Sequence, residues 1–300
     1  MKVCQLVIGP AGSGKSTFCE TMKNHCDAAG RVVHVVNLDP AAEDETITYP
    51  VSIDIRELIS LEDAMEECGL GPNGGLLFCL EYLEENVEWL MEALEPYSED
   101  DYLLVDCPGQ IEAYSHLSVF RTVVGKLQSD GWTVGCVYCL DAQFSEEASK
   151  FVAGSLNALT AMVNMELPHV NVMTKMDLVR GRGRGGMEGV ERNGSGVDWR
   201  EEDDEERELI IPDRENLLRA LNQTYGKHLK RFARLNEGIV SLLDEWSLIG
   251  YVGLDVRDEH SVAGVLMQLD FAVGWMGDED DVRGKYDQDA LEEADYELDV

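Results

Sequence analysis

The sequence predicts an α/β fold of three layers, in which helices cover both faces of a mostly parallel β-sheet. Short apolar runs recur along the chain with helical patterns between them, which is the order of repeated β-α-β units. The runs are almost continuously apolar, as expected for strands that are covered on both faces. A glycine-rich loop follows the first run, at the kind of strand end where such sheets bind ligands. The expected strands are 3–8, 32–37, 102–106, 133–140, 169–174 and one near 247–252.

The glycine-rich loop, residues 9–17, fits the pattern G-x-x-x-x-G-K-[ST] of the phosphate-binding P-loop, so the fold class is that of a P-loop NTPase. A strand precedes it and a helix over 17–29 follows, so backbone N–H groups and a helix N-terminus can surround phosphates. Lys15 is expected to reach the outer phosphates, and the Ser16 hydroxyl to hold Mg²⁺. A chance match in a glycine-rich turn is the alternative. The expected nucleotide contacts in this loop are Gly12, Ser13, Gly14, Lys15, Ser16 and Thr17.

The composition bears on which classes of partner the protein can bind. The 300 residues include 24 Lys and Arg against 59 Asp and Glu, a net charge of −35, which repels nucleic-acid backbones. This charge suits basic protein surfaces, although solubility alone also explains it. No apolar run approaches the roughly 20 residues that span a bilayer, so we expect neither a membrane partner nor a signal peptide. The eight cysteines lie mostly in apolar runs, which favours reduced thiols in a cytosolic or nuclear setting.

The second strand ends at Asp39, and Pro40 prevents it from continuing. At this end of the sheet the Asp39 carboxylate can orient the attacking water or water bound to Mg²⁺. A plain turn aspartate is the alternative. A helix is expected next, over 55–67.

A second glycine-rich segment, 69–75, precedes a long amphipathic helix whose leucine stripe extends from 76 to 94. Within the segment, Asn73 is a good helix N-cap, and capping alone explains it. The surplus of glycines favours close approach of another backbone instead, which indicates a further role.

The strand 102–106 ends in Asp106, and Gly109 and Gln110 follow in the D-x-x-G-Q pattern of GTPases. The aspartate of this pattern reaches Mg²⁺, the glycine N–H meets the outermost phosphate, and a glutamine at this position orients water.

The strand 169–174 ends in Thr174, Lys175, Met176 and Asp177, which match the guanine-recognition pattern N/T-K-x-D. Asp177 can accept two hydrogen bonds from guanine, whereas adenine would leave the buried carboxylate unpaired. The Lys175 stem can lie against the base. Thr174 stands where asparagine is usual, and a chance match is the alternative. A second base-contacting loop is expected near 251–255, with a poor signal.

The composition changes after residue 179. Gly-Arg repeats and an acidic run over about 180–208 predict a flexible insertion rather than an RNA contact. Helices are expected over 214–223, 229–243 and 261–275. Residues 276–300 contain eleven Asp and Glu against two Lys and Arg, so we expect one domain over 1–275 and a disordered acidic tail.

Together these motifs resemble those of the GPN-loop GTPases, whose namesake tripeptide is Gly71-Pro72-Asn73. The resemblance covers 1–179 closely and 208–275 more distantly. It is strongest to the third eukaryotic branch of that family, on the stretches 37–42, 54–58, 71–82, 141–144 and 173–177.

The resemblance implies a SIMIBI-type class of dimeric P-loop GTPases that bind GTP and GDP with Mg²⁺. In that class Gly71, Pro72 and Asn73 would lie near the phosphates of a partner subunit, which favours a catalytic or dimer-forming Asn73. The implied partners are a related GPN-loop GTPase, in a heterodimer or a homodimer, and RNA polymerase II subunits or assembly factors. The implied role is polymerase assembly and nuclear import by a cytoplasmic protein that shuttles to the nucleus.

Two departures imply slow hydrolysis. Pro10 stands where the wider class carries a lysine that reaches across the dimer, and the motifs contain no arginine finger, which contributes on the order of 10³–10⁵ in rate. We therefore expect a switch in which water attacks the outermost phosphate in line. The resemblance and the motifs together give Lys15, Asp39, Asn73, Asp106 and Gln110 as catalytic residues, and Ser16, Asp39 and Asp106 as Mg²⁺ ligands.

Three other functions stay open. An ATP-dependent P-loop kinase shares the first loop but does not need the Thr174–Asp177 pattern. A nickel-type metallochaperone GTPase requires a His-rich or Cys-His cluster, whereas the six histidines here are scattered. A nucleotide-bound scaffold with negligible turnover would need only binding and dimerisation.

Overall fold

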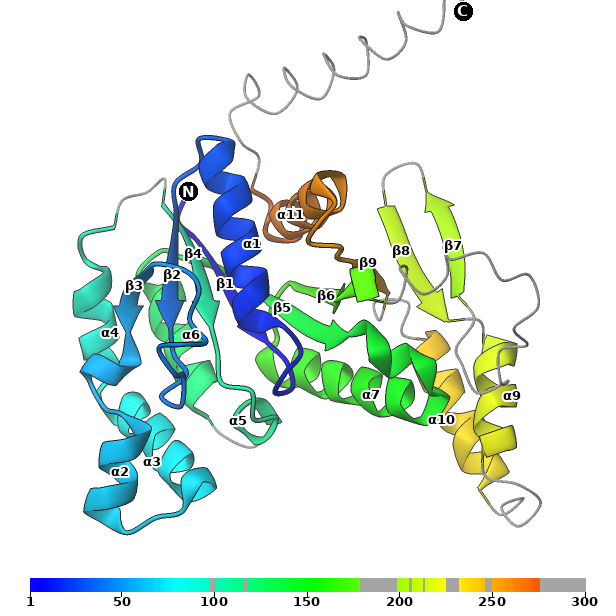
Figure 1. The fold of residues 1–300 in the computed structure, drawn as a ribbon, viewed down its shortest axis with the longest axis horizontal. Helices are drawn as coiled ribbons and strands as arrows, with labels where there is room; N and C mark the ends of the chain where they lie inside the picture. The colour runs from blue at the N-terminus through cyan, green and yellow to red at the C-terminus, as the bar shows by residue number, and fades with distance from the viewer. Residues whose placement is uncertain are drawn as a thin grey trace, which may run out of the picture.

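The computed structural model describes residues 1–97, 101–115, 118–178, 199–204, 207–212, 214–224, 232–245 and 250–275. Their strands form one sheet in the order β3-β2-β4-β1-β5-β6-β9-β8-β7 (Figure 1). Strands β3 to β9 in this order are parallel, and β8 and β7 are antiparallel, so the predicted mostly parallel sheet is confirmed. The strands are β1 (Val3–Ile8), β2 (Val33–Asn37), β3 (Val51–Asp54), β4 (Tyr102–Asp106), β5 (Thr133–Asp141), β6 (His169–Thr174), β7 (Trp199–Asp204), β8 (Arg207–Pro212) and β9 (Tyr251–Gly253).

Helices pack on both faces of the sheet, which gives the three expected layers (Figure 1). On one face the apolar sides of α1 and α11 form a buried cluster, and on the other face those of α3, α4, α6 and α7 form a larger one. The helices are α1 (Lys15–Ala28), α2 (Leu61–Cys68), α3 (Pro72–Glu85), α4 (Val87–Leu94), α5 (Glu112–Ser115), α6 (Val119–Ser129), α7 (Ala148–Met165), α9 (Arg214–Thr224), α10 (Ala233–Glu245) and α11 (Glu259–Val273). Among these described helices, none has the length and hydropathy that a membrane crossing needs.

Two expected helices differ in the structure because capping residues interrupt them. The helix expected over 55–67 begins only at Leu61, where the Ser60 side chain caps α2 by accepting from the Asp63 N–H. The first part of that range is a short 3₁₀ turn, η1 (Ile55–Glu57), in which the Asp54 carboxylate accepts from the Arg56 N–H. The single helix expected after the second glycine-rich segment is broken at Asn86 into α3 and α4.

Part of the expected flexible insertion has regular structure. Strands β7 and β8 form an antiparallel hairpin that extends the sheet beyond β9. Of the remaining insertion, residues 180–198, 205 and 206 lie outside the described residues, as does the acidic segment 276–300.

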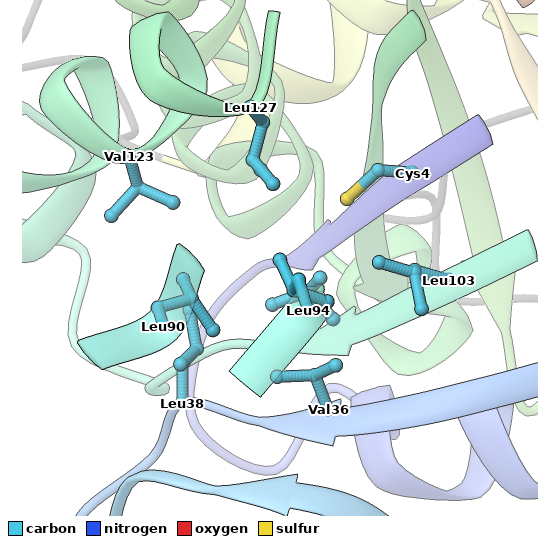
Figure 2. A pocket seen from close by; sticks show the side chains of 9 residues that line it. Cys4, Val36, Leu38, Leu90, Leu94, Leu103, Val123 and Leu127 are labelled. Atoms are coloured by element: carbon cyan, nitrogen blue, oxygen red, sulfur yellow. The ribbon is translucent and has the colours of Figure 1, made fainter. Parts of the chain in front are cut away.

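A small apolar cavity of about 10 Å³ lies in the core near α4 and α6 (Figure 2). Side chains of the sheet and of these two helices line it, among them Cys4, Leu94 and Leu127. A cavity of this volume has room for at most about one water molecule, and its lining offers no charged group to a ligand. The cavity is therefore a packing gap in the core and not a nucleotide site.

Arg31, in the turn between α1 and β2, fixes the end of α11 to the sheet. Its guanidinium donates to both carboxylate oxygens of Asp270, at 2.8 and 2.9 Å. It also lies against the rings of Tyr102 and Trp275, 4.1 and 3.7 Å from their centroids. Burial raises the pKa of Asp270, and the bonds from Arg31 act in the opposite direction.

We expect Arg31→Ala to lower the free energy of unfolding by about 3 kcal/mol at pH 7, because it leaves the buried Asp270 carboxylate unpaired. The loss of Arg31 raises the pKa of Asp270 in the folded state further. The variant then binds this proton more readily folded than unfolded, so its stability falls as the pH rises through that pKa. Denaturant unfolding at pH 7 and pH 4.5 should therefore show a smaller loss in acid.

Lys23→Ala is the matched control, because its partner Asp27 is 51% exposed and such pairs contribute less than about 1 kcal/mol. An equal loss for Arg31→Ala at both pH values would contradict the role given to Asp270.

Candidate nucleotide-binding site

The P-loop connects β1 to α1 at the carboxyl ends of the parallel strands. Gly9, Gly12 and Gly14 have φ angles of 141°, 74° and 87°, a region that strains other residues. A Cβ on Gly9 would also lie 2.4 Å from the Cys139 carbonyl oxygen. Gly14 caps α1 without a side-chain hydrogen bond, so no side chain of the cap occupies the first N–H groups of the helix. Such N–H groups are suited to an anion.

Lys15 lies in the loop with only 8% of its surface exposed. Its ammonium donates to the carbonyl oxygens of Gly9 and Pro10, both at 3.2 Å. The positive charge of Lys15 lies near two carboxyl groups, those of Asp39 and Asp106. Burial raises the pKa of each carboxyl, and the Lys15 charge lowers it again. The predicted lysine is therefore at the acidic end of the loop, and phosphate oxygens could replace the carbonyls as its acceptors.

Asp106, at the end of β4, is 3% exposed and meets two hydroxyl groups. It accepts a hydrogen bond from the Tyr49 hydroxyl at 2.7 Å. Burial raises the pKa of Asp106, and the nearby Ser16 and Tyr49 hydroxyls act in the opposite direction. The structure thus places the Ser16 hydroxyl near Asp106.

Asp39 is part of a turn, as the alternative of a plain turn aspartate predicts. Its carboxylate accepts from the Ala41 N–H at 2.9 Å, and its own N–H donates to the Asn37 side chain at 3.0 Å. The Asp39 charge nevertheless interacts with those of Lys15 and Asp106. Asp39 therefore combines a turn with a place near the predicted phosphate end.

The oxygen atoms of this end fit Mg²⁺. The donors are the Ser16 hydroxyl and the carboxylates of Asp106 and Asp39, and a hard cation prefers such oxygens. Within the described ranges, no group of three or more His, Cys, Asp and Glu could hold a metal ion. Mg²⁺ is commonly bound by one or two carboxylates together with substrate phosphates.

The GPN tripeptide opens α3, with Gly71 as the N-cap and Pro72 in the first turn. The capping role considered for Asn73 is therefore wrong, because Asn73 lies one residue inside the helix. Its side-chain oxygen instead accepts from the Gln110 amide at 3.3 Å. The structure thus brings together two predicted catalytic residues within one chain.

Gly109 explains how closely the D-x-x-G turn approaches the P-loop. A Cβ on Gly109 would lie 2.8 Å from the Ala11 Cα. Real Cβ atoms do not approach a backbone so closely, so this position requires glycine. The turn that carries Gln110 therefore rests directly on the phosphate-binding loop.

Thr174 and Lys175 attach the end of β6 to the P-loop. The Thr174 hydroxyl donates to the Ser13 carbonyl at 2.6 Å. Lys175, which has a positive φ of 59°, donates to the Gly12 carbonyl and to the Asp141 carboxylate, both at 2.7 Å. Both residues belong to the predicted guanine-recognition turn, and both also hold the P-loop in position.

Asp177 faces the loop between β9 and α11. Leu254 exchanges backbone hydrogen bonds with Met173 and Met176, which fixes that loop beside the T-K-x-D turn. The Asp177 carboxylate, 12% exposed, lies 3.4 Å from the guanidinium of Arg257, whose side chain is 76% exposed. The second base-contacting loop expected near 251–255 is therefore adjacent to Asp177. Because the Arg257 side chain is largely exposed, it can move aside for a ligand.

Two residues of the site carry no sequence signal. Tyr49 and Arg257 lie outside every motif, and a lone tyrosine or arginine in a loop has no spacing that marks it. The only local hint is that Arg257 follows the loop at 251–255, where a base contact was expected.

Comparisons with known proteins agree on the family. Residues 7–275 match a family described as conserved hypothetical ATP binding proteins. GPN-loop GTPase 3 of Dictyostelium discoideum is 44% identical over 273 residues, which cover 91% of this chain and 87% of that protein. GPN-loop GTPase 3 of Danio rerio is 43% identical over 274 residues, with 91% and 88% covered. The fold is similar to that of a Pyrococcus abyssi GTPase in its apo form, with a TM-score of 0.63, 21% identity, and 88% of this chain and 95% of that chain covered.

Proposed function

The chain belongs to the GPN-loop GTPases and is a GTP hydrolase that binds guanine nucleotides, and we propose that it acts as a slow switch completed by a second subunit. The observation that carries the proposal is that two motifs meet the P-loop directly and a third reaches it through Gln110. Ala11 touches Gly109, Ser13 accepts from Thr174, and Ser16 lies near Asp106. Asn73 joins this group through Gln110. One loop thus links the phosphate and base ends.

In the proposed reaction, water attacks the outermost phosphorus in line and GDP leaves. Lys15 binds the oxygens on which negative charge develops, and Gln110 orients the water while Asn73 holds the Gln110 amide. Mg²⁺, when held by Ser16 and Asp106 with Asp39 nearby, neutralises charge on the phosphates. The motifs contain no arginine, so one such contribution is missing and turnover is slow.

The exposed surface around Asn73 supports the proposed dimer. Gly71, Pro72 and Asn73 are exposed, and Leu77 and Tyr82 on the same helix are 41% and 37% exposed. A related GPN-loop GTPase is the proposed partner, or a second copy of this chain.

The proposed biological role is assembly and nuclear import of RNA polymerase II by a protein that shuttles between cytoplasm and nucleus. This part follows from the family resemblance. The net charge of −35 supports docking on basic protein surfaces.

Guanine specificity separates this proposal from an ATP-dependent kinase. The matching family is described as ATP-binding, but Asp177 would lose both of its base hydrogen bonds with adenine. The test uses the full chain with a fluorescent GDP analogue, displaced by GTP or by ATP. We expect GTP to act at concentrations at least about 100-fold lower than ATP, because each lost bond to a charged group costs roughly 1.5–3 kcal/mol. Equal displacement by ATP would favour the kinase.

Single-turnover hydrolysis of GTP, with and without a co-purified GPN-loop GTPase, tests the switch. A faster rate with the partner supports it. Tight binding without turnover in either case would favour the scaffold instead.

Affinity purification that recovers neither a related GTPase nor polymerase subunits would contradict the biological role and leave the GTPase activity intact.

A further inference from the structure

Tyr49 places a buried hydroxyl group against the acidic end of the nucleotide site. It lies just before β3, at the end of the segment that begins after β2, and is 5% exposed. Its ring belongs to the buried cluster that also contains Phe18 and Cys19 of α1. Its hydroxyl donates to Asp106 Oδ2 at 2.7 Å, across 57 residues of sequence. The packed ring therefore fixes the point in space from which this hydrogen bond is donated.

The backbone of Asp106 is already held on both sides. The Leu38 N–H donates to the Asp106 carbonyl at 2.8 Å, and the Cys107 N–H donates to the Val7 carbonyl at 3.2 Å. The remaining freedom of Asp106 is rotation of its side chain. A hydrogen bond to one carboxylate oxygen restricts that rotation, as outer partners of metal-binding carboxylates commonly do.

The segment that carries Tyr49 is anchored beside it. Thr48 donates to Glu20 of α1 at 2.6 Å. The earlier part of the segment is held by Arg56, which donates to the Ala42 carbonyl at 3.1 Å and to the Asp44 carboxylate at 2.6 Å. Tyr49 is thus presented to Asp106 by a segment with several attachments, and does not depend on its own bond for its position.

We propose that Tyr49 is a positioning residue, which holds the Asp106 carboxylate in the orientation that binds Mg²⁺ beside the nucleotide. This inference rests on the proposed function, in which Asp106 acts on the metal side. In this role Tyr49 acts through Asp106, and its hydroxyl, rather than its ring, carries the role.

The test measures Mg²⁺ binding and not turnover. The dissociation rate of a fluorescent GDP analogue from the full chain is followed as Mg²⁺ is titrated, for the wild type and for Tyr49→Phe, which keeps the packed ring. We expect the half-maximal Mg²⁺ concentration to rise about 10- to 100-fold in the variant, the usual effect of removing such an outer partner. In excess EDTA the two dissociation rates should agree within about twofold, because the pocket itself is intact.

Tyr102→Phe is the matched control. Tyr102 lies at the other end of the same strand, β4, is 2% exposed, and also carries a buried hydroxyl. Its removal should leave the Mg²⁺ titration unchanged. A Tyr49→Phe titration that overlays the wild type would overturn the inference, and so would an equal increase in dissociation rate with and without Mg²⁺, which indicates general damage to the pocket.

Asp106→Asn separates the inference from the proposed function. If Asp106→Asn shifts the Mg²⁺ titration and Tyr49→Phe does not, only the role of Tyr49 is wrong. If Asp106→Asn leaves the titration unchanged, the proposed function of Asp106 fails and the inference fails with it.

Discussion

Replacing Lys15 with alanine is expected to lower the single-turnover rate of GTP hydrolysis about 1,000-fold, since removal of one preorganised donor to a developing charge costs roughly 10²–10³ in rate. Lys15 is 8% exposed, so little water shields its interaction with the phosphates. Its present acceptors, the Gly9 and Pro10 carbonyls, are neutral and can be exchanged for phosphate oxygens. The rate is measured with protein in excess over radiolabelled GTP, at a concentration that saturates binding.

Lys150→Ala removes a lysine of the same charge that is 62% exposed on α7 and paired with Glu147. It should hydrolyse GTP at the wild-type rate. If Lys15→Ala is folded by circular dichroism and hydrolyses GTP as fast as this control, the catalytic site is not at the P-loop.

Asp177→Asn is expected to weaken GTP binding by a factor of 100 or more. The carboxylate can accept two hydrogen bonds from guanine, and each bond to a charged group contributes roughly 1.5–3 kcal/mol. The asparagine amide presents a donor where the exocyclic amine of guanine also donates. Xanthine carries a carbonyl at that position, so the same variant should bind xanthosine triphosphate more tightly than the wild type does. Competition against a fluorescent nucleotide measures both affinities.

The gain for xanthosine triphosphate is the decisive result, because a damaged pocket would lose affinity for every base. Asp130→Asn, at a carboxylate that is 48% exposed and paired with Lys2, serves as the control and should retain the wild-type preference. A variant at Asp177 that still prefers GTP as strongly as the wild type would show that this turn does not read the base.

The main layers of the fold could be predicted because their signals are local. Parallel strands covered on both faces need continuous apolar runs, and the P-loop needs glycines at fixed spacing. Strand β3 was not predicted because it is short, polar at Ser52 and Asp54, and pairs only with β2 at the edge of the sheet. The hairpin of β7 and β8 was missed since its first strand, Trp199–Asp204, is mostly charged.

In the candidate site too, residues within motifs could be predicted and their distant partners could not. Lys15, Ser16, Asp106 and Gln110 lie where their motifs place them, since each motif follows a strand and the strand ends meet. Their partners come from distant parts of the sequence. Tyr49 reaches Asp106 only because β2, β3 and β4 are neighbours, and Arg257 reaches Asp177 only because β9 pairs with β6. Such contacts depend on the assembled sheet and leave no periodic or spaced pattern.

The clamp of Arg31 on Asp270 and Trp275 also has an electrostatic consequence. It fixes the residue from which the acidic segment departs near the end of α1, whereas the P-loop lies at the start of that 14-residue helix, about 20 Å away. This distance exceeds two Debye lengths of about 8 Å at physiological ionic strength. The Asp270 carboxylate at that attachment point is therefore screened from a bound triphosphate. The fold thus keeps this described carboxylate and its partner Arg31 too far from the loop to oppose or attract an anionic ligand strongly.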